Sequence, residues 1–385
     1  MKWIRPNTIT GPVAQGAKYF RRKDIEDKIW HELQKGNSVL FLAPRRVGKS
    51  SIISYMADNP ADGFCCKYED IESDSSIQDF YKRLIRMSLD SLTRYGKVKK
   101  GISGWWNSWT IKSIGKDNVG LGKAHVDHRK EFNNLLGELK KNEEKVALFL
   151  DEFPDVVMKL SKNNEAEQLL EDVRHLCHDD QFKGTFTLVL LGSVGLAHIV
   201  KQVTGRSHKI NQLHKEHLPS LERTKAEDFL DFLLQGATME VGSSEREYLL
   251  NKVGNFIPFY IQLLIEECDD SLYMEQRVKL TNIDIDKAYA SLLKKNEHFQ
   301  DWDERLSKYF SEKYRFLHQV LTQCARKGSI SLLDILDIGV KYGNDLYWKA
   351  DIDDILVADG YITADEDNYT FISPLMRDWW KLRHP

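Results

Sequence analysis

The 385-residue sequence contains only five cysteines, and no two of them form a CxxC pair. An odd, scattered set of cysteines argues against a disulfide framework or a four-cysteine zinc site. No apolar run approaches the ~18–20 residues that a membrane span needs. The first ten residues, MKWIRPNTIT, also lack the apolar stretch of a signal peptide. We therefore expect a cytoplasmic protein without a membrane span.

An excess of charge of one sign is missing as well. The formal net charge is −3, so a strongly basic whole-molecule surface is excluded while local basic patches remain allowed. Hydrophobic residues make up 42% of the chain and charged residues 29%, which is ordinary for a globular protein. The length is sufficient for two or three domains.

What the sequence does contain is a candidate phosphate-binding loop. Residues 41–52 read FLAPRRVGKSSI, so an apolar strand at 39–42 runs through Gly-Lys-Ser into a helix. Glycine lets the backbone approach phosphate oxygens, and the loop amides then face the anion. In the pattern G-x-x-x-x-G-K-[ST], Ala43 stands in place of the first glycine, and a methyl group fits there if the φ of Ala43 is negative. The residues predicted to hold the nucleotide are Pro44, Arg45, Arg46, Val47, Gly48, Lys49, Ser50 and Ser51.

Two later strands supply the other candidate groups. Residues 146–152 read VALFLDE, an apolar strand that ends in two carboxylates. Ligand chemistry collects at the carboxyl ends of parallel strands, so we expect Asp151 and Ser50 to hold Mg²⁺ and Glu152 to polarise the attacking water. Residues 186–193, FTLVLLGS, form a further strand that ends at Ser193. Ser193 either contacts the water or the γ-phosphate, or only marks a turn.

These motifs, in this order, resemble the STAND class of P-loop ATPases, and within it the archaeal-type ATPase group. KYFRRKDIEDKIWHEL, APRRVGKSS, LFLDEFP, LLGSVG, TGRSHKI and VGNFIPFYIQLL carry the resemblance. It implies an α/β fold: a P-loop NTPase core of the ASCE type, with a parallel sheet that has an extra strand beside the phosphate loop. It also implies that Arg22 belongs to the nucleotide site, that Arg206 contacts the γ-phosphate of its own or a neighbouring subunit's nucleotide, and that Pro258 lies near the adenine.

The remaining chain divides by its patterns. We expect the ATPase core over residues 1–218, a helical lid over 219–300 and a winged-helix domain over 301–385. In the last, helices at 304–325 and 331–338 precede two short strands, DGYIT and NYTFIS, around the turn ADED. DNA binding rests on a basic face, but residues 308–385 carry a net charge of −2. We favour a structural or protein-contacting wing.

The segment 96–124 is basic and rich in tryptophan, and we expect it to be a β-hairpin or an extended loop that projects from the core. Its aromatic rings and lysines suit nucleic acid, a membrane surface or a protein partner. Alternatively, the rings pack on the protein's own core. The residues that would contact nucleic acid are Lys97, Lys99, Lys100, Trp105, Trp106 and Trp109.

The leading functional hypothesis is an ATPase that uses ATP and Mg²⁺ as a molecular switch, with slow or activator-dependent hydrolysis. Its nucleotide state would control homo-oligomerisation or a separately encoded protein partner. Analogy with the resembling class suggests signalling or anti-phage defence. The alternative is a DNA-loading or remodelling ATPase of the origin-recognition or transposition type, supported by the winged helix and the basic segment.

Overall fold

The computed structural model describes residues 2–114, 126–192, 196–205, 213–295 and 297–385. The chain divides into two compact units. The first, called the core unit here, comprises Arg21–Leu42 and Lys49–Leu218. The second, the C-terminal unit, comprises Met1–Phe20, Ala43–Gly48 and Pro219–Pro385.

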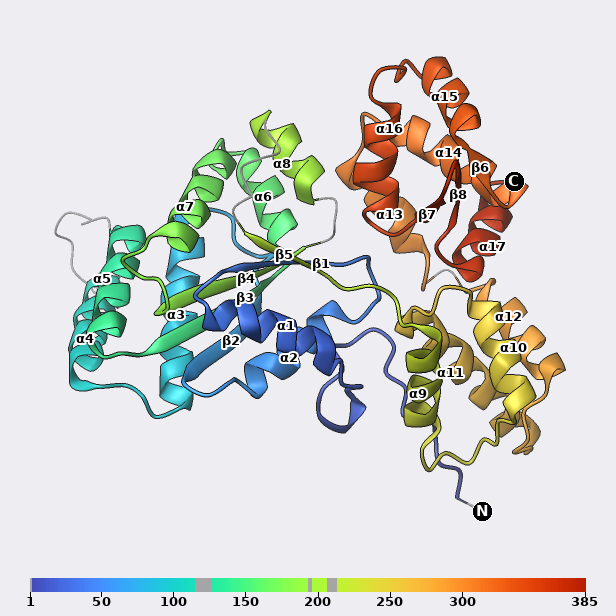
Figure 1. The fold of residues 1–385 in the computed structure, drawn as a ribbon, viewed down its shortest axis with the longest axis horizontal. Helices are drawn as coiled ribbons and strands as arrows, with labels where there is room; N and C mark the ends of the chain where they lie inside the picture. The colour runs from blue at the N-terminus through green and yellow to red at the C-terminus, as the bar shows by residue number, and fades with distance from the viewer. Residues whose placement is uncertain (1, 115–125, 193–195, 206–212, 296) are drawn as a thin grey trace. The chain divides into compact units, whose positions relative to one another are not determined.

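The core unit is built on a parallel five-stranded sheet (Figure 1). The strand order is β2-β3-β4-β1-β5, and every pairing is parallel. The strands are β1 (Val39–Leu42), β2 (Phe64–Asp70), β3 (Lys145–Asp151), β4 (Phe186–Gly192) and β5 (His214–His217). β1 and β4 are buried along their whole length, because helices cover both faces of a parallel sheet. The position of β4 between β1 and β3 confirms the expected extra strand beside the phosphate loop.

Helices connect the strands of the core unit. They are α1 (Lys23–Gln34), α2 (Lys49–Asp58), α3 (Ile77–Arg94), α4 (Lys100–Ile114), α5 (His128–Lys141), α6 (Phe153–Ser161), α7 (Ala166–His178) and α8 (Leu196–Thr204). α3 begins where the Ser76 hydroxyl accepts a hydrogen bond from the Asp79 amide, which satisfies one of the free amides of the first turn. Its apolar residues Phe80 and Leu84 are fully buried in the core.

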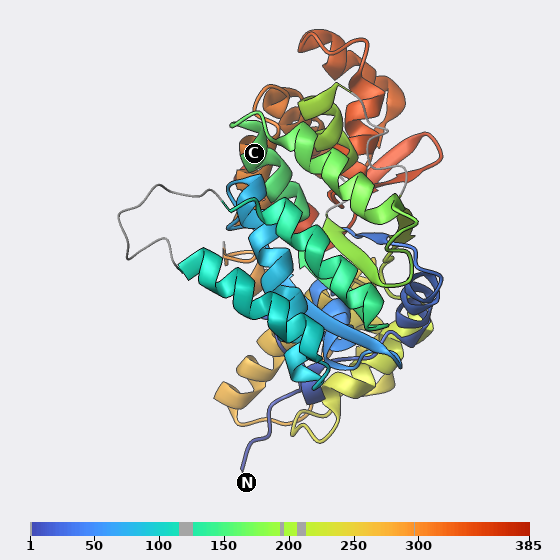
Figure 2. The same ribbon diagram turned by 90° about the vertical axis from the view of Figure 1, so that its left-hand side faces the viewer.

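The prediction of a hairpin or extended loop at 96–124 is wrong for residues 100–114, which form α4. Ile102, Trp105, Trp106 and Trp109 recur at helical spacing, and all four belong to or pack against the main apolar core. The rings of Trp105 and Trp109 stack with centroids 6.1 Å apart. The glycines misled the prediction, because burial of one helical face outweighs their low helix propensity. α4 packs against α5 (Figure 2). Residues 115–125 of this segment lie outside the described residues.

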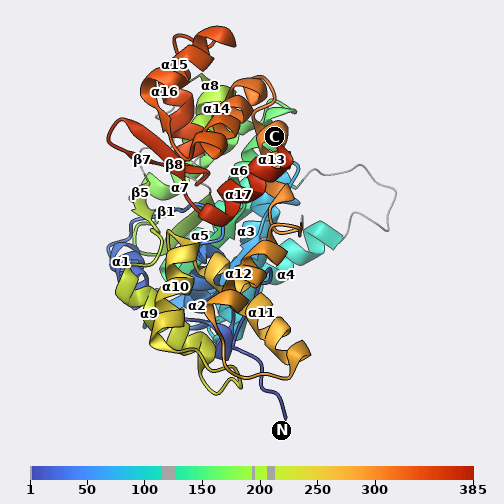
Figure 3. The same cartoon turned by 90° about the vertical axis from the view of Figure 1, so that its right-hand side faces the viewer.

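The C-terminal unit is mainly helical (Figure 3). Its helices are α9 (Arg223–Leu234), α10 (Ser243–Val253), α11 (Pro258–Glu275), α12 (Asn282–Leu292), α13 (Gln300–Tyr309), α14 (Tyr314–Lys327), α15 (Leu332–Lys341), α16 (Trp348–Asp351) and α17 (Pro374–Arg383). The helix predicted at 304–325 is in fact two helices. The break is at Phe310, the C-cap residue of α13, whose backbone is not helical (φ −130°, ψ 38°) and whose side chain is buried.

A small antiparallel sheet completes this unit. β6 (Ile330–Ser331), β7 (Ile362–Asp365) and β8 (Asn368–Phe371) pair in the order β6-β8-β7. β7 and β8 form the hairpin that the sequence predicted around ADED, and Glu366 has a positive φ of 49° in its turn.

The N-terminal segment packs along the helices that follow residue 219. The Arg5 guanidinium pairs with Asp269 at 2.6 Å, and the backbone N–H of Asn7 donates to the Leu233 carbonyl at 2.7 Å. The Phe20 ring lies edge-on to Phe229, with centroids 5.1 Å apart. These contacts place the first twenty residues within the C-terminal unit. Within the described ranges, no helix is both long enough and apolar enough to cross a membrane.

Candidate nucleotide-phosphate site

The predicted phosphate loop, residues 43–48, connects β1 to the first turn of α2. Gly48 has a φ of +99°, and a Cβ atom on it would meet nothing within 4 Å. The backbone conformation therefore requires glycine here, and the space beside it stays open. Arg46 also has a left-handed φ of 68°, whereas Ala43 keeps a negative φ, as expected for a methyl group at that position. Loops that alternate between right- and left-handed residues turn their amides toward an anion.

The carboxylate of Asp151 is the centre of the polar cluster at the end of β3. Its Oδ2 accepts a hydrogen bond of 2.5 Å from the Ser50 hydroxyl, although the two residues are 101 positions apart. Lys49 Nζ lies 3.9 Å from Oδ1, which also accepts from the Glu152 amide at 2.9 Å. The Asp151 residue is only 4% exposed. The structure thus brings together Lys49, Ser50 and Asp151, as predicted, and hydroxyl and carboxylate oxygens are ligands that Mg²⁺ accepts.

Tyr68 of β2 is a member of this cluster that the sequence analysis missed. Its hydroxyl donates to Asp151 Oδ2 at 2.9 Å. Burial, and then the neighbouring Asp151 charge, raise the pKa of Tyr68, so the phenol stays protonated and serves as a donor. Tyr68 pairs in register with Phe149, and side chains alternate along a strand. Aligning β2 with β3 would therefore have placed Tyr68 on the same face as Asp151.

Glu152, the predicted water-activating residue, has an unusual backbone. Its φ and ψ are 55° and 34°, the left-handed conformation, at the residue that precedes α6. For a residue other than glycine this costs about 1–3 kcal/mol, and such strain is concentrated at functional sites. Glu152 is the single residue between the end of the buried strand β3 and the start of α6, so the chain turns at this residue.

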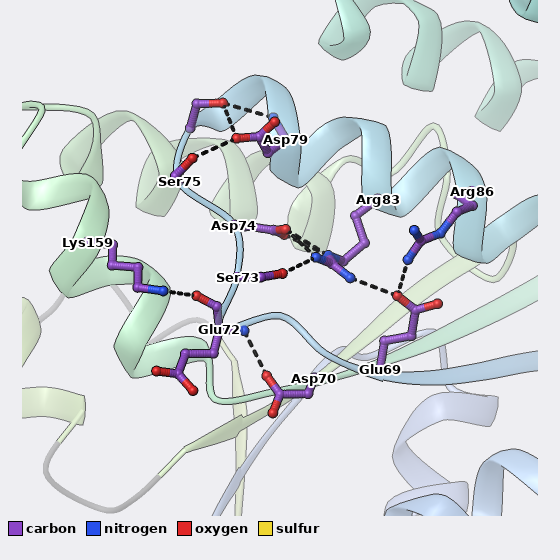
Figure 4. Close-up of polar contacts among 11 residues, drawn as sticks. Glu69, Asp70, Glu72, Ser73, Asp74, Ser75, Asp79, Arg83, Arg86 and Lys159 are labelled. Atoms are coloured by element: carbon purple, nitrogen blue, oxygen red, sulfur yellow. Dashed lines mark hydrogen bonds and ion pairs between the residues drawn. The ribbon is translucent and has the colours of Figure 1, made fainter.

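The segment that follows β2 supports the end of β3, and Figure 4 shows the side-chain contacts of this segment. The Ile71 amide donates to the Asp151 carbonyl at 3.2 Å, which extends the strand pairing by one bond. Arg83 of α3 holds this segment from the side. Its Nε donates to both carboxylate oxygens of Asp74, at 2.8 and 2.9 Å, and its Nη1 donates to Glu69 at 2.9 Å. A charge-assisted network of this kind fixes the backbone beside Asp151.

The arginines of the phosphate loop are engaged within the C-terminal unit. Arg45 Nη1 and Arg46 Nη2 lie 3.0 and 3.2 Å from the same atom, Oδ2 of Asp301. The Arg46 guanidinium also lies over the Phe259 ring, 4.4 Å from its centroid. Arg45 lies 5.9 Å from the centroid of Trp302. One carboxylate at the start of α13 therefore pairs with both arginines that the sequence assigned to the nucleotide.

A second contact holds the same loop. Gly360 has a φ of +83°, and a Cβ atom on it would lie 2.6 Å from Cβ of Pro44. Only glycine permits this approach, because both the backbone conformation and the space exclude a side chain. Nearby, the Tyr361 hydroxyl donates to the Trp302 carbonyl at 2.8 Å, which ties the segment before β7 to α13.

The other predicted residues have separate positions. Val47 is 3% exposed, and Ser51 lies in the first turn of α2. Arg22 is 9% exposed and occupies the N-cap position of α1 in the core unit, without a capping hydrogen bond from its side chain. Pro258 is the first residue of α11, directly before the Phe259 that contacts Arg46. Ser193 and Arg206 lie outside the described residues, so their predicted roles are not tested.

The lysines of the basic segment are partly engaged by the chain itself. Lys99 Nζ lies 2.8 Å from Glu144, which is 5% exposed, and Lys97 Nζ lies 3.6 Å from the same carboxylate. Together with the packed tryptophans of α4, this agrees with the alternative in which the segment serves the protein's own core. Lys100, the first residue of α4, is exposed.

Comparisons with known proteins find similarity in structure alone. No family model and no curated protein matches the chain. The Walker-type ATPase PABY2304 of Pyrococcus abyssi aligns with a TM-score of 0.65 at 15% identity, covering 96% of this chain and 98% of that chain. The fold is that of a P-loop NTPase. The Aeropyrum pernix ORC2 protein, solved as ADPNP-ADP complexes, aligns with a TM-score of 0.54 at 12% identity over 94% and 91% of the two chains. Both share the P-loop NTPase core and the helical C-terminal region.

Proposed function

We propose that this chain is a Mg²⁺-dependent ATPase that works as a molecular switch. The observation that carries the proposal is the meeting of Lys49, Ser50 and Asp151 beside the open backbone of Gly48. A lysine and loop amides are suited to phosphate, and a hydroxyl paired with a carboxylate is suited to Mg²⁺. The structural similarity to a Walker-type ATPase supports the same activity.

Each residue of the site has a defined task in this proposal. The loop amides and Lys49 bind the phosphates, and Ser50 and Asp151 hold Mg²⁺, which neutralises charge on the phosphates when bound. Asp151 is already oriented by Tyr68 and by the Glu152 amide. Glu152 orients the attacking water and accepts its proton. Prearranged donors and acceptors of this kind reduce the reorganisation that the reaction requires.

The switch follows from the contacts of Arg45 and Arg46. Both arginines bind Asp301 of α13, and the same arginines are predicted to bind the nucleotide. A bound triphosphate would compete with Asp301 for them, so nucleotide binding and the state of α13 are coupled. A ligand shifts such an equilibrium by its difference in affinity for the two states. We propose that this coupling controls homo-oligomerisation or a separately encoded partner, in signalling or defence.

The C-terminal sheet and its helices favour a protein partner over DNA. We infer a winged helix from α14, β6, α15 and the β7–β8 hairpin, in that order in the chain. Acidic residues form the hairpin turn: Asp365, Glu366 and Asp367. A wing that contacts DNA phosphates needs cations at this place. The DNA-loading alternative is supported by the structural similarity to the ORC2 protein.

Nucleotide binding tests the site assignment. We expect Lys49→Ala to abolish high-affinity ATP binding in a calorimetric titration with Mg²⁺ present, while the control Lys82→Ala, at an exposed position of α3, binds as the wild type does. Unchanged ATP affinity in Lys49→Ala would show that the site has been misplaced. Adding duplex DNA to hydrolysis assays separates the two functions: DNA stimulation that weakens with salt supports the loading alternative.

A further inference from the structure

Three potential metal ligands from separate helical elements meet in the C-terminal unit, and none of them belongs to the predicted phosphate site. They are Asp303 of α13, His318 of α14 and His384, which follows α17; Figure 3 labels the three helices. One donor atom from each lies within 4.8 Å of the other two. We propose that these side chains form a binding site for a divalent transition metal of the Zn²⁺ class.

One of the distances in this cluster is close to that between two ligands of a bound ion. His318 Nε2 and His384 Nδ1 are 3.1 Å apart, and His384 Nε2 is 3.9 Å from Asp303 Oδ2. Ligands at about 2.0–2.2 Å from a tetrahedral Zn²⁺ are separated by roughly 3.3–3.6 Å. These two separations use different nitrogens of His384, and one ion takes only one nitrogen of an imidazole, so the 3.9 Å separation is the one that describes two ligands of an ion bound at Nε2. A shift of a few tenths of an ångström would bring His384 Nε2 and Asp303 Oδ2 into range, and the hydrogen bond between His318 and His384 would open as His318 joins them.

One nitrogen in the cluster has no hydrogen-bond partner. His384 Nε2 is buried, and within the described part of the chain nothing donates to it or accepts from it. Its nearest acidic oxygen, on Asp303, is too distant for a hydrogen bond at 3.9 Å. Buried polar atoms are normally satisfied, so an exception calls for an explanation such as an ion. A metal between the imidazole and the carboxylate would satisfy both groups.

Neighbouring side chains orient the three ligands, as is typical around metal sites. The Tyr314 hydroxyl donates to Asp303 Oδ1 at 3.1 Å, which leaves Oδ2 facing His384. On the other side, Thr322 Oγ1 lies 3.5 Å from His318 Nδ1 and itself accepts from Trp380 Nε1 at 3.2 Å. His318 therefore has Nδ1 beside a fixed hydroxyl, and Nε2, which lies against His384, is the nitrogen left for the proposed ion.

Packing against an aromatic ring partly buries the two imidazoles, and burial disfavours a charged group. Burial lowers the pKa of His384, and burial together with the nearby His384 lowers the pKa of His318. The Trp380 ring lies 4.6 Å from the His384 ring, centroid to centroid, and 5.4 Å from that of His318. The Trp380 ring therefore shields one side of the cluster from water. The three ligands are partly exposed, so a water molecule can serve as the fourth ligand.

The proposed ion would connect α13, α14 and the end of α17. Of these, α13 also contacts the phosphate loop, through Asp301. Asp303 lies two residues after Asp301, the partner of Arg45 and Arg46. An ion that fixes α13 against α14 and the end of α17 would therefore also fix the carboxylate that binds the loop arginines. A metal bound only to the folded state also stabilises that state in proportion to its affinity and concentration.

Zinc binding by the full chain tests the proposal. After treatment with a chelator and dialysis, the protein is titrated with Zn²⁺ against a chromogenic zinc chelator, in excess Mg²⁺. We expect one high-affinity equivalent in the wild type, in the control His298→Gln and in Asp151→Asn. We expect it to be lost in His318→Gln and His384→Gln, and weakened about tenfold in Tyr314→Phe. Retention in Asp151→Asn separates this site from the phosphate site.

Two further readouts keep the test decisive. Zn²⁺ should raise the thermal midpoint of the wild type and of His298→Gln but not that of His318→Gln, and Co²⁺ should give visible absorption bands of a four-coordinate site. If His318→Gln does not fold, Asp303→Asn takes its place. Zinc uptake that is equal in the wild type and the cluster variants, or absent from the wild type, would show that the three side chains only form a hydrogen-bonded group.

Discussion

Asp301 holds both arginines of the phosphate loop through a single carboxylate oxygen, and its removal gives a quantitative prediction. Asp301→Asn keeps the size of the side chain but removes the charge that pairs with Arg45 at 3.0 Å and with Arg46 at 3.2 Å. If the arginines leave Asp301 to bind the triphosphate, the wild type loses these two ion pairs on binding ATP. The variant does not, so we expect it to bind ATP more tightly.

The exposure of the three side chains sets the free energy that the two ion pairs contribute. Both arginine side chains are 26% exposed and that of Asp301 is 35% exposed, so water screens the pairs only in part. Partly exposed ion pairs contribute about 0.5–1 kcal/mol each, and the two together about 1–2 kcal/mol. Since 1.4 kcal/mol is a factor of ten in affinity, the dissociation constant for ATP should fall about 5- to 30-fold in Asp301→Asn.

Calorimetric titration with ATP and Mg²⁺ measures this change. The control is Asp345→Asn, because Asp345 is an exposed carboxylate in the segment between α15 and α16. The difference between wild type and Asp301→Asn should decrease at high salt, since salt screens the pairs that are lost. An ATP affinity that is unchanged or weaker in Asp301→Asn refutes the reasoning, and a weaker one would mean that Asp301 positions the arginines for the nucleotide.

Three further predictions follow from single contacts. Tyr68→Phe removes a donor to Asp151, so we expect the Mg²⁺ concentration for half-maximal hydrolysis to rise severalfold with the thermal midpoint nearly unchanged; a loss of stability without a change in Mg²⁺ dependence would contradict this. Trp109→Ala should lower the free energy of unfolding in urea by about 2–3 kcal/mol, because the ring packs on the core, and should leave duplex DNA binding unchanged; the reverse pattern would restore the nucleic-acid role of α4. Burial lowers the pKa of His298 below its ordinary value of 6.5, so the unfolded chain takes up the proton first. The free energy of unfolding therefore has its full value above about pH 6.5 and decreases as the pH falls below 6.5. The variant His298→Gln should show a smaller decrease in urea titrations across pH 5–7, and an unaltered pH dependence would contradict the assignment.

The parts of the site that the sequence predicted are those encoded by local pattern. The run FLAPRRVGKSSI and the strand VALFLDE are each contiguous, and a parallel sheet brings their ends together. Their meeting at Ser50 and Asp151 therefore needed only the assumption of a shared sheet edge. The left-handed backbone of Glu152 could not be predicted in the same way, because glutamate has no preference for that conformation.

The parts that were missed depend on long-range contacts. Tyr68 acts through strand register, and Asp301 contacts Arg45 across 256 residues, so no short pattern contains either relation. The helix α4 was missed for a different reason. Its glycines favour turns, although Ile102, Trp105 and Trp109 have helical spacing. Burial of that apolar face decided the conformation against local propensity.

The central claim, that the end of β3 is the catalytic site of an ATPase, is tested most directly by Mg²⁺-dependent ATP hydrolysis in the wild type and in Glu152→Gln. Calorimetry on the same preparations measures ATP affinity. The account predicts that Glu152→Gln binds ATP as tightly as the wild type but hydrolyses it at least about 100-fold more slowly, as expected when a positioned base is lost. Equal rates of hydrolysis in the two proteins, at equal affinity, would contradict the assignment of Glu152 and of the site built around it.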